Sequence, residues 1–116
     1  MFRILQMHEQ FGMTCHDVDF SAKEKEFRYT AMLEEIVEYR DADLPEDELD
    51  ALVDLVVFAL GTVERMGWAD VYEEAFTRVM AANMQKQVGT NKKRGDFHID
   101  LIKPDGWEAP DLKDLV

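Results

Sequence analysis

The strongest constraint on the fold is the stretch of residues 33–61, LEEIVEYRDADLPEDELDALVDLVVFALG, in which two acidic segments flank a proline. The glutamates of the first segment are one, three and four residues apart, which places them on one helical face: Glu34, Glu35 and Glu38. The aspartates of the second segment repeat at three and four residues and form a single stripe: Asp47, Asp50 and Asp54. The short connection containing Pro45 predicts an antiparallel helical hairpin, so carboxylates from both helices are expected to converge.

Converging carboxylates repel one another unless a positive charge lies between them. A hard divalent cation such as Mg²⁺ suits this position, because it takes oxygen ligands and retains water molecules for a phosphate substrate. Two solvated acidic faces on ordinary amphipathic helices are the commoner outcome of such a charge pattern. Asp54 favours the cation, because it stands within the apolar run ALVDLVVFAL, where a charge is costly unless it is paired or coordinated.

Composition narrows the class of protein. A chain of 116 residues with 47% apolar residues is expected to form one domain with one core. Its net charge of −12 argues against DNA or RNA as a partner and against an anionic membrane surface, but not against a nucleotide, since a bound metal reverses the local sign. Residues 1–11 lack the apolar core of a secretory signal, and the longest apolar run, residues 55–60, is far below the roughly 20 residues of a membrane span. The lone Cys15 cannot form an internal disulfide, which fits a reducing cytoplasm.

Hydrophobic periodicity predicts four helices joined by short loops, with a loop over residues 13–20. The helices are expected over residues 2–11, about 21–42, about 43–66 and about 70–87. Gly12, Gly67 and Gly89 are the expected stops. Capping-box patterns mark the last three helix starts: Ser21 with Glu24, Asp43 with Glu46, and Asp70 with Glu73.

The third helix is apolar on nearly every side, which places it in the middle of a bundle or at a subunit interface. Gly61 costs about 1 kcal/mol relative to alanine in a helix, so a close approach of a neighbouring element is expected there. On the second helix, Arg28 lies two turns before Glu35 and either reaches a phosphate or pairs with Glu24 on the surface.

Residues 88–116 differ in composition from the helical core of about residues 1–87 and read as an irregular, turn-rich tail of the same domain. They hold five basic residues: Lys92, Lys93, Arg94, Lys103 and Lys113. This cluster either neutralises the acidic faces or holds a phosphate, for which arginine and lysine are both suited.

Several motifs together resemble the all-α nucleoside triphosphate pyrophosphohydrolases, the superfamily of MazG, the phosphoribosyl-ATP pyrophosphohydrolases and the dimeric dUTPases. The first family motif, two adjacent glutamates and a third three positions later, stands here as Glu34, Glu35 and Glu38. The second motif is represented by DALVDLVVFALGT, and FRYTAMLEE, ANMQK, KRG and DLIKPDGWEAPDL extend the resemblance to small MazG-like proteins of bacteria and their phages. The resemblance implies an all-α four-helix bundle of the MazG-like type with an irregular C-terminal tail, assembled as a homodimer or a dimer of dimers.

The second motif departs from the family at one position. It supplies the aspartate as Asp54 but has Ala51 where the family has a glutamate. Asp50, one turn before Asp54, is the first candidate to replace that glutamate, and Asp47 is the second. The departure leaves open how many metal ions are bound.

The resemblance implies Mg²⁺-dependent hydrolysis between the α and β phosphates of a nucleoside triphosphate, giving a nucleoside monophosphate and pyrophosphate, with Mn²⁺ as an alternative metal. The implied metal ligands are Glu35, Glu38 and Asp54, with Asp50 as a fourth. Glu34 is expected to bind a further metal or to accept a proton from the attacking water. The protein would act in the cytoplasm, that of the host if a phage encodes it.

Basic and polar residues complete the expected site. Asn83 and Lys86, one turn apart on the fourth helix, are expected to contact ribose or phosphate. Lys93 and Arg94 are expected to close over the phosphates, in the same subunit or in its partner.

Two other classes remain. A carboxylate-bridged di-iron bundle characteristically needs Glu-x-x-His pairs, and no glutamate lies three positions before His8, His16 or His98. A catalytically inactive helical nucleotide-binding or adaptor protein would keep the bundle and tolerate Ala51. Metal-dependent release of pyrophosphate separates the enzyme from the adaptor.

Overall fold

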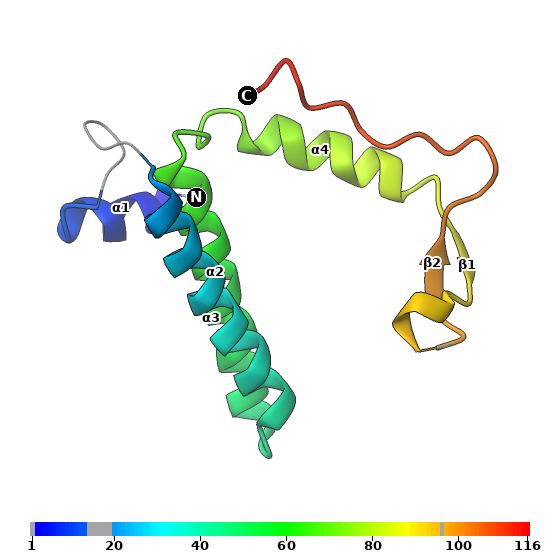
Figure 1. Ribbon diagram of the computed structural model, residues 1–116, viewed down its shortest axis with the longest axis horizontal. Helices are drawn as coiled ribbons and strands as arrows, with labels where there is room; N and C mark the ends of the chain where they lie inside the picture. The colour runs from blue at the N-terminus through cyan, green and yellow to red at the C-terminus, as the bar shows by residue number, and fades with distance from the viewer. Residues whose placement is uncertain (1, 14–19, 96) are drawn as a thin grey trace. The chain divides into compact units, whose positions relative to one another are not determined.

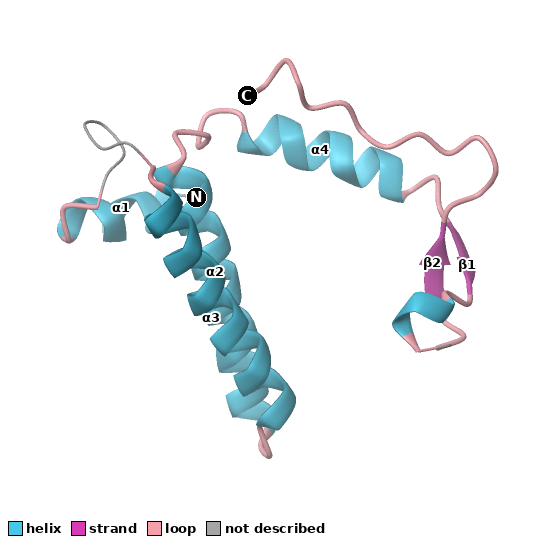
Figure 2. Ribbon diagram, in the orientation of Figure 1, coloured by secondary structure: helices cyan, strands magenta, loops and turns pink. Residues whose placement is uncertain are grey.

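The computed structural model describes residues 2–13, 20–95 and 97–116, so Cys15 and His16 lie outside the described residues, as does most of the loop expected over residues 13–20. The chain is mostly helical, as expected, and its described part also carries a small two-stranded sheet (Figure 2). It divides into two compact units, Met1–Asp70 and Val71–Val116. None of the helices described is long and apolar enough to cross a membrane.

The first unit is built on a helical hairpin of α2 (Ala22–Asp41) and α3 (Pro45–Arg65), which lie side by side (Figure 1). The predicted cap of α2 is confirmed, because the Ser21 hydroxyl accepts a hydrogen bond of 3.1 Å from the Glu24 backbone N–H. The predicted Asp43 cap of α3 is wrong. Leu44 occupies that position without a side-chain hydrogen bond, and Pro45 sets the start because its fixed φ suits a first helical turn.

Glycines end two helices of this unit, as predicted. At the end of α3, Gly67 has a φ of 77°, and the N–H groups of Gly67 and Trp68 bond the carbonyls of Glu64 and Val63 at 2.9 and 3.0 Å. This is the Schellman arrangement, which satisfies carbonyl groups that the helix itself leaves free. Gly12, with a φ of 66°, ends α1 (Phe2–Gln10) in the same way.

Charged side chains rather than large apolar ones fill the contact among α1, α2 and α3. His8 is 1% exposed, and its Nδ1 lies 2.5 Å from Oε2 of the equally buried Glu64. Arg65 donates two hydrogen bonds to Glu24, at 2.6 and 2.9 Å, and a third of 3.2 Å to the Met13 carbonyl. These two pairs tie α1 and α2 to the end of α3, because a buried charge is tolerated only when it is paired.

Gly61 of α3 lies against this group of charges. A Cβ atom there would come within 3.0 Å of both His8 Nε2 and Arg28 Nη1. The close approach predicted at Gly61 is therefore confirmed, and the neighbours are side chains from α1 and α2.

The second unit begins with α4 (Tyr72–Asn83), followed by β1 (Gln87–Gly89), a short 3₁₀ helix (Lys92–Arg94) and β2 (Asp100–Ile102). The predicted Asp70 cap is wrong, since Val71 is the N-cap and makes no side-chain cap bond. The helix also stops before residue 87, because Gln87 pairs with Ile102 in an antiparallel ladder. The expected irregular tail is thus partly ordered into a β-hairpin.

The last segment of the chain is fastened to α4. The Trp107 indole N–H donates to the Ala82 carbonyl at 2.7 Å, and Arg78 bonds both carboxylate oxygens of Asp114 at 2.6 and 3.0 Å. Arg78 also donates to the Asp111 carbonyl at 3.0 Å. A stretch without regular secondary structure is held in place by these side chains.

The pair between Glu24 and Arg65 yields the first prediction. Hydrogen bonds from Arg65 hold the pKa of Glu24 below its usual value, so the ionised form stabilises the folded state. Glu24→Gln should lower the free energy of unfolding by about 1 to 2 kcal/mol at pH 7. Because the folded pKa is depressed, the difference from wild type should be lost as the pH falls below about 4.5. Urea titrations at pH 7 and at a pH below about 4.5 measure the free energy of unfolding, with the exposed Glu26→Gln as control. An equal loss of stability in the control at pH 7 would contradict the pairing.

Candidate functional site

Acidic side chains of α2 and α3 act on one another across the hairpin. Burial raises the pKa of Glu35 to about 6, and a hydrogen bond with Glu38 and the negative charges of Glu38, Asp54 and Asp50 add to the effect. Two of these groups lie on α2 and two on α3. The hairpin thus brings together the four carboxylates that sequence reasoning assigned to the metal.

Glu35 is the most constrained member of this group. Its Oε2 atom is buried and has no hydrogen-bond partner among the described residues. A buried carboxylate oxygen without a donor is costly, and three further acids nearby increase the cost of its ionisation. Such an oxygen is well suited to accept a proton or a cation.

The donor set fits a hard cation in its chemistry, since two glutamates and two aspartates offer the oxygen ligands that Mg²⁺ prefers. Among residues 2–13, 20–95 and 97–116, however, no three acidic, histidine or cysteine side chains are grouped closely enough to hold a metal ion between them. The four carboxylates therefore share a field without forming a closed coordination shell.

Ala51 and Glu34 are not among the four acids that act on one another around Glu35. Ala51, at the position of the missing family glutamate, is only 2% exposed. A glutamate at this buried position would need room that the hairpin does not provide as it stands. Glu34 lines a shallow hollow of about 380 Å³ on α2, which Glu38 also lines. Glu38 is therefore shared between the hollow and the group around Glu35.

The sequence was compared with protein-family models and with curated proteins. Neither comparison gave a match.

Three of the basic residues predicted to contact substrate lie in the second unit. Lys86, Lys93 and Arg94 line one hollow of about 460 Å³ at the β-hairpin. Arg94 also forms an ion pair of 3.3 Å with Asp100, and Lys86 lies with its Nζ 5.0 Å from the centre of the Trp107 ring. Asn83 is the last residue of α4. The structure thus groups three of the five predicted contacts around one basic hollow, while the fifth, Arg28, lies on α2 in the first unit.

Arg28 does not pair with Glu24 on the surface, which was one of the two places considered for it, and its contact with a phosphate stays a prediction. It is 6% exposed, and Glu24 bonds Arg65 instead. Sequence reasoning missed the surrounding buried charges of His8, Glu64 and Arg65. A signal was present, since Glu64 and Arg65 continue by three and four residues the stripe of α3 on which Gly61 lies.

The raised pKa of Glu35 gives a second prediction. Its unfolded value is 4.5 and its folded value about 6, so the ionised side chain destabilises the folded state above pH 6. Without divalent cations at pH 7.5, Glu35→Gln should raise the free energy of unfolding by about 1 kcal/mol, an amount reduced by solvent screening of this half-buried group. This gain in the free energy of unfolding should shrink as the pH falls from 6 to 4.5, and it should vanish below pH 4.5. Denaturant melts across this range test it; a gain independent of pH would show that charge is not the cause.

Proposed function

We propose that the protein is a metal-dependent nucleoside triphosphate pyrophosphohydrolase, which cleaves between the α and β phosphates to release pyrophosphate. The observation that supports the proposal is that Glu38, Asp54 and Asp50 add to the effect of burial in raising the pKa of Glu35, while Oε2 of Glu35 is buried and has no hydrogen-bond partner in the described part of the chain. Acids that act on one another in this way destabilise the fold unless a cation offsets their repulsion. The resemblance to the MazG-like proteins implies Glu35, Glu38 and Asp54 as metal ligands, with Asp50 as the candidate to replace the missing glutamate.

Mg²⁺, when bound, would supply positive charge to the phosphates and make a water molecule more acidic. The chain's own contribution is to hold four oxygen donors at fixed places on two packed helices. Glu35 carries a proton at pH values below about 6, which a cation must displace. Metal affinity should therefore rise with pH through this region. Glu34, next to this group in sequence, is the residue proposed to accept the proton of the attacking water.

The alternative is a catalytically inactive helical protein that binds a nucleotide or serves as an adaptor. Ala51 favours it, because the family glutamate is replaced by a buried side chain that cannot bind a metal. The two proposals differ in whether pyrophosphate is released, which makes the choice between them experimental.

A homodimer, or a pair of dimers, is the proposed assembly. Large apolar side chains on both helices of the hairpin are exposed in the single chain, with Ile36, Val53 and Val56 each about half exposed, at 49%, 52% and 54%. Exposed large apolar side chains on packed helices are typical of an interface. A second copy of the hairpin offers the matching surface.

Turnover provides the third prediction. With Mg²⁺, the wild-type protein should release pyrophosphate from a nucleoside triphosphate, and Glu38→Gln or Asp54→Asn should reduce kcat/KM by at least about 100-fold, since each removes a ligand charge. Asp50→Asn should impair turnover far more than Asp47→Asn, its matched control three residues away, because Asp50 contributes to the field at Glu35 and Asp47 is the weaker candidate. Coupled detection of pyrophosphate measures all four variants.

The same experiment can refute the proposal. A wild-type protein that releases no pyrophosphate from any ribo- or deoxyribonucleoside triphosphate, with Mg²⁺ or Mn²⁺ present, would leave the adaptor as the better explanation. Equal and nearly normal turnover in both aspartate variants would show that neither replaces the missing glutamate.

Assembly gives the fourth prediction. Introducing charge by the double substitution Val53→Glu and Val56→Glu should convert the dimer to monomers, since ionised glutamates are costly in an apolar interface. Light scattering coupled to size exclusion measures the mass, with Thr77→Glu on the exposed face of α4 as a charge control. A wild-type chain that remains monomeric at high concentration would refute the proposed assembly.

A further inference from the structure

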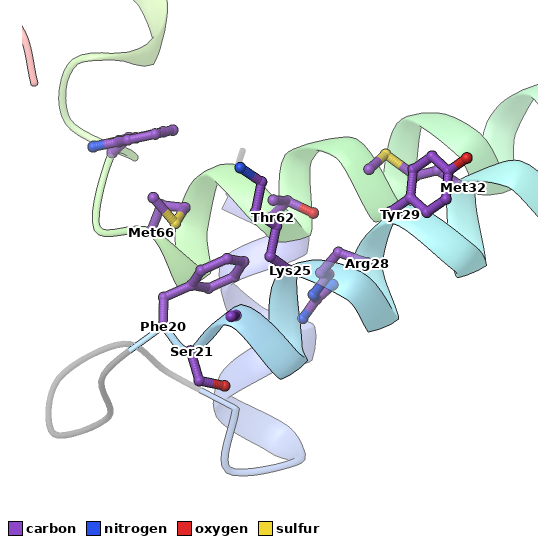
Figure 3. A pocket seen from close by; sticks show the side chains of 10 residues that line it. Phe20, Ser21, Lys25, Arg28, Tyr29, Met32, Thr62 and Met66 are labelled. Atoms are coloured by element: carbon purple, nitrogen blue, oxygen red, sulfur yellow. The ribbon is translucent and has the colours of Figure 1, made fainter.

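A cavity of about 620 Å³ lies between α2 and α3 in the first unit. Its walls are largely apolar and include three aromatic residues, Phe20, Tyr29 and Trp68. Figure 3 shows Phe20 and Met66 toward one end and Tyr29 with Met32 toward the other, with Lys25, Arg28 and Thr62 between them. A cavity of this size accommodates a small organic molecule, and its aromatic residues are suited to a flat ring.

Arg28 is a buried charged residue in this largely apolar lining. It is 6% exposed, and its Nε is buried without a hydrogen-bond partner in the described part of the chain. The guanidinium carbon of Arg28 lies 5.8 Å from the centre of the Phe27 ring. Burial lowers the pKa of Arg28, which reflects the cost of removing its charge from water. An arginine buried at a cavity wall with donors unused is explained if a ligand supplies the acceptors.

The surrounding charges favour a neutral acceptor over a phosphate. The two carboxylates that act on Arg28, those of Glu24 and Glu64, are already engaged with Arg65 and His8. Two arginines and two glutamates balance, so among the described residues that line the cavity the cation left to meet a phosphate is Lys25. Lys25 is exposed, and its charge is accommodated by water. The ligand that fits is a flat ring that carries adjacent hydrogen-bond acceptors.

The cavity and the acidic group lie along the same pair of helices. Arg28 precedes Glu35 by seven residues on α2, and Thr62 follows Asp54 by eight on α3, so each interval is two helical turns, or roughly 11 Å. Because α2 and α3 are antiparallel neighbours, both intervals run in the same direction in space. A nucleotide with its phosphates at the carboxylates would extend its base toward this cavity.

We propose that the cavity beside Arg28 binds the base of the nucleotide and that Arg28 selects guanine by donating hydrogen bonds to O6 and N7. Guanine presents two acceptors on this edge, whereas adenine replaces one of them with the N6 amino donor. Arginine is suited to the pair because its planar fork spans two acceptors. The direction of the phosphates rests on the proposed function, while the binding of the base does not.

The test uses nucleosides, which carry neither phosphate nor metal. By titration calorimetry on the full chain, guanosine and inosine should bind between about 5-fold and about 150-fold more tightly than adenosine, the range expected for one bidentate arginine contact. The 7-deaza analogue of guanosine should lose most of this advantage, because it lacks the N7 acceptor. Equal affinity for guanosine and adenosine, or no binding of either, would overturn the proposal. So would competition by inorganic phosphate for the guanosine site.

Substitutions then assign the preference to Arg28. Arg28→Lys keeps the positive charge but cannot span two acceptors, so it should reduce the preference for guanosine to less than about 2-fold. Arg40→Lys, on the exposed last turn of the same helix, is the matched control and should keep the preference. Circular dichroism and thermal melting establish that both variants fold. A folded Arg28→Lys protein that still prefers guanosine would overturn the assignment.

If Arg28→Lys does not fold, the isosteric and uncharged Thr62→Val extends the test. A cavity that holds the base should bind guanosine with a different affinity in this variant, and unchanged affinity would count against the proposal.

Failure of this inference is distinguishable from failure of the proposed function. Guanosine binding that depends on Arg28, without any release of pyrophosphate, would refute the pyrophosphohydrolase and keep the base site. Release of pyrophosphate at equal rates from guanine and adenine nucleotides, unchanged by Arg28→Lys, would refute the base site and keep the enzyme.

Discussion

The buried charge network at the end of the hairpin organises the first unit. His8 of α1 meets Glu64 of α3, and Arg65, the next residue, reaches Glu24 of α2. Adjacent residues on one helix therefore hold two different helices, which fixes both at the same level of α3. Apolar burial contributes little to this arrangement in the single chain, since Ala31 and Ala51 are its fully buried apolar residues among those described. The geometry of the hairpin, and with it the distance between acids and cavity, depends on these pairs.

Charged side chains at one end of the hairpin are hydrogen-bonded to one another, whereas two charged side chains farther along it each keep a buried polar atom without a hydrogen-bond partner among the described residues. The pairs around Arg65 are hydrogen-bonded, whereas, within the residues that the structure describes, Glu35 has a buried oxygen without a donor and Arg28 a buried nitrogen without an acceptor. Opposite charges two turns apart cannot neutralise each other directly, because the helices hold them apart. A fold that keeps an unpaired carboxylate and an unpaired guanidinium gives up stability at both places. The proposed ligands, a cation at the first place and an acceptor-bearing ring at the second, would offset this cost.

In the second unit, polar and cation–aromatic contacts hold a chain segment that has little regular secondary structure. Trp107 is held by its indole hydrogen bond to α4, and Lys86 and Lys103 each lie 5.0 Å from its ring, which places two cations against one aromatic side chain. Gly89 permits the ladder to form, since a Cβ atom there would lie 2.6 Å from Cδ1 of Ile102. The hollow lined by basic residues follows from this hairpin.

Local signals in the sequence determined much of the helical structure. The Ser21 cap, the stops at Gly12 and Gly67 and the turn before Pro45 depend on neighbouring residues, so they follow from hydrogen bonds and φ preferences over a few positions. The placement of the acids on the two helices of one hairpin was also predictable, because it follows from helical spacing and one short turn. The strands were not, since three-residue segments are decided by their partners, 15 to 11 positions away along the chain, rather than by their own pattern.

Tertiary structure alone decided which charges are buried. In the sequence, Arg28 and Glu34 look alike as charged residues on an amphipathic helix. The first becomes part of the interior because α1 and Gly61 of α3 close around it, whereas the second remains on the outer face. Spacing along one helix specifies a face, but the identity of the elements that cover that face depends on contacts between residues as far apart as His8 and Glu64. Burial changes the energy of a charge far more than sequence neighbours do, and it is a property of the assembled helices.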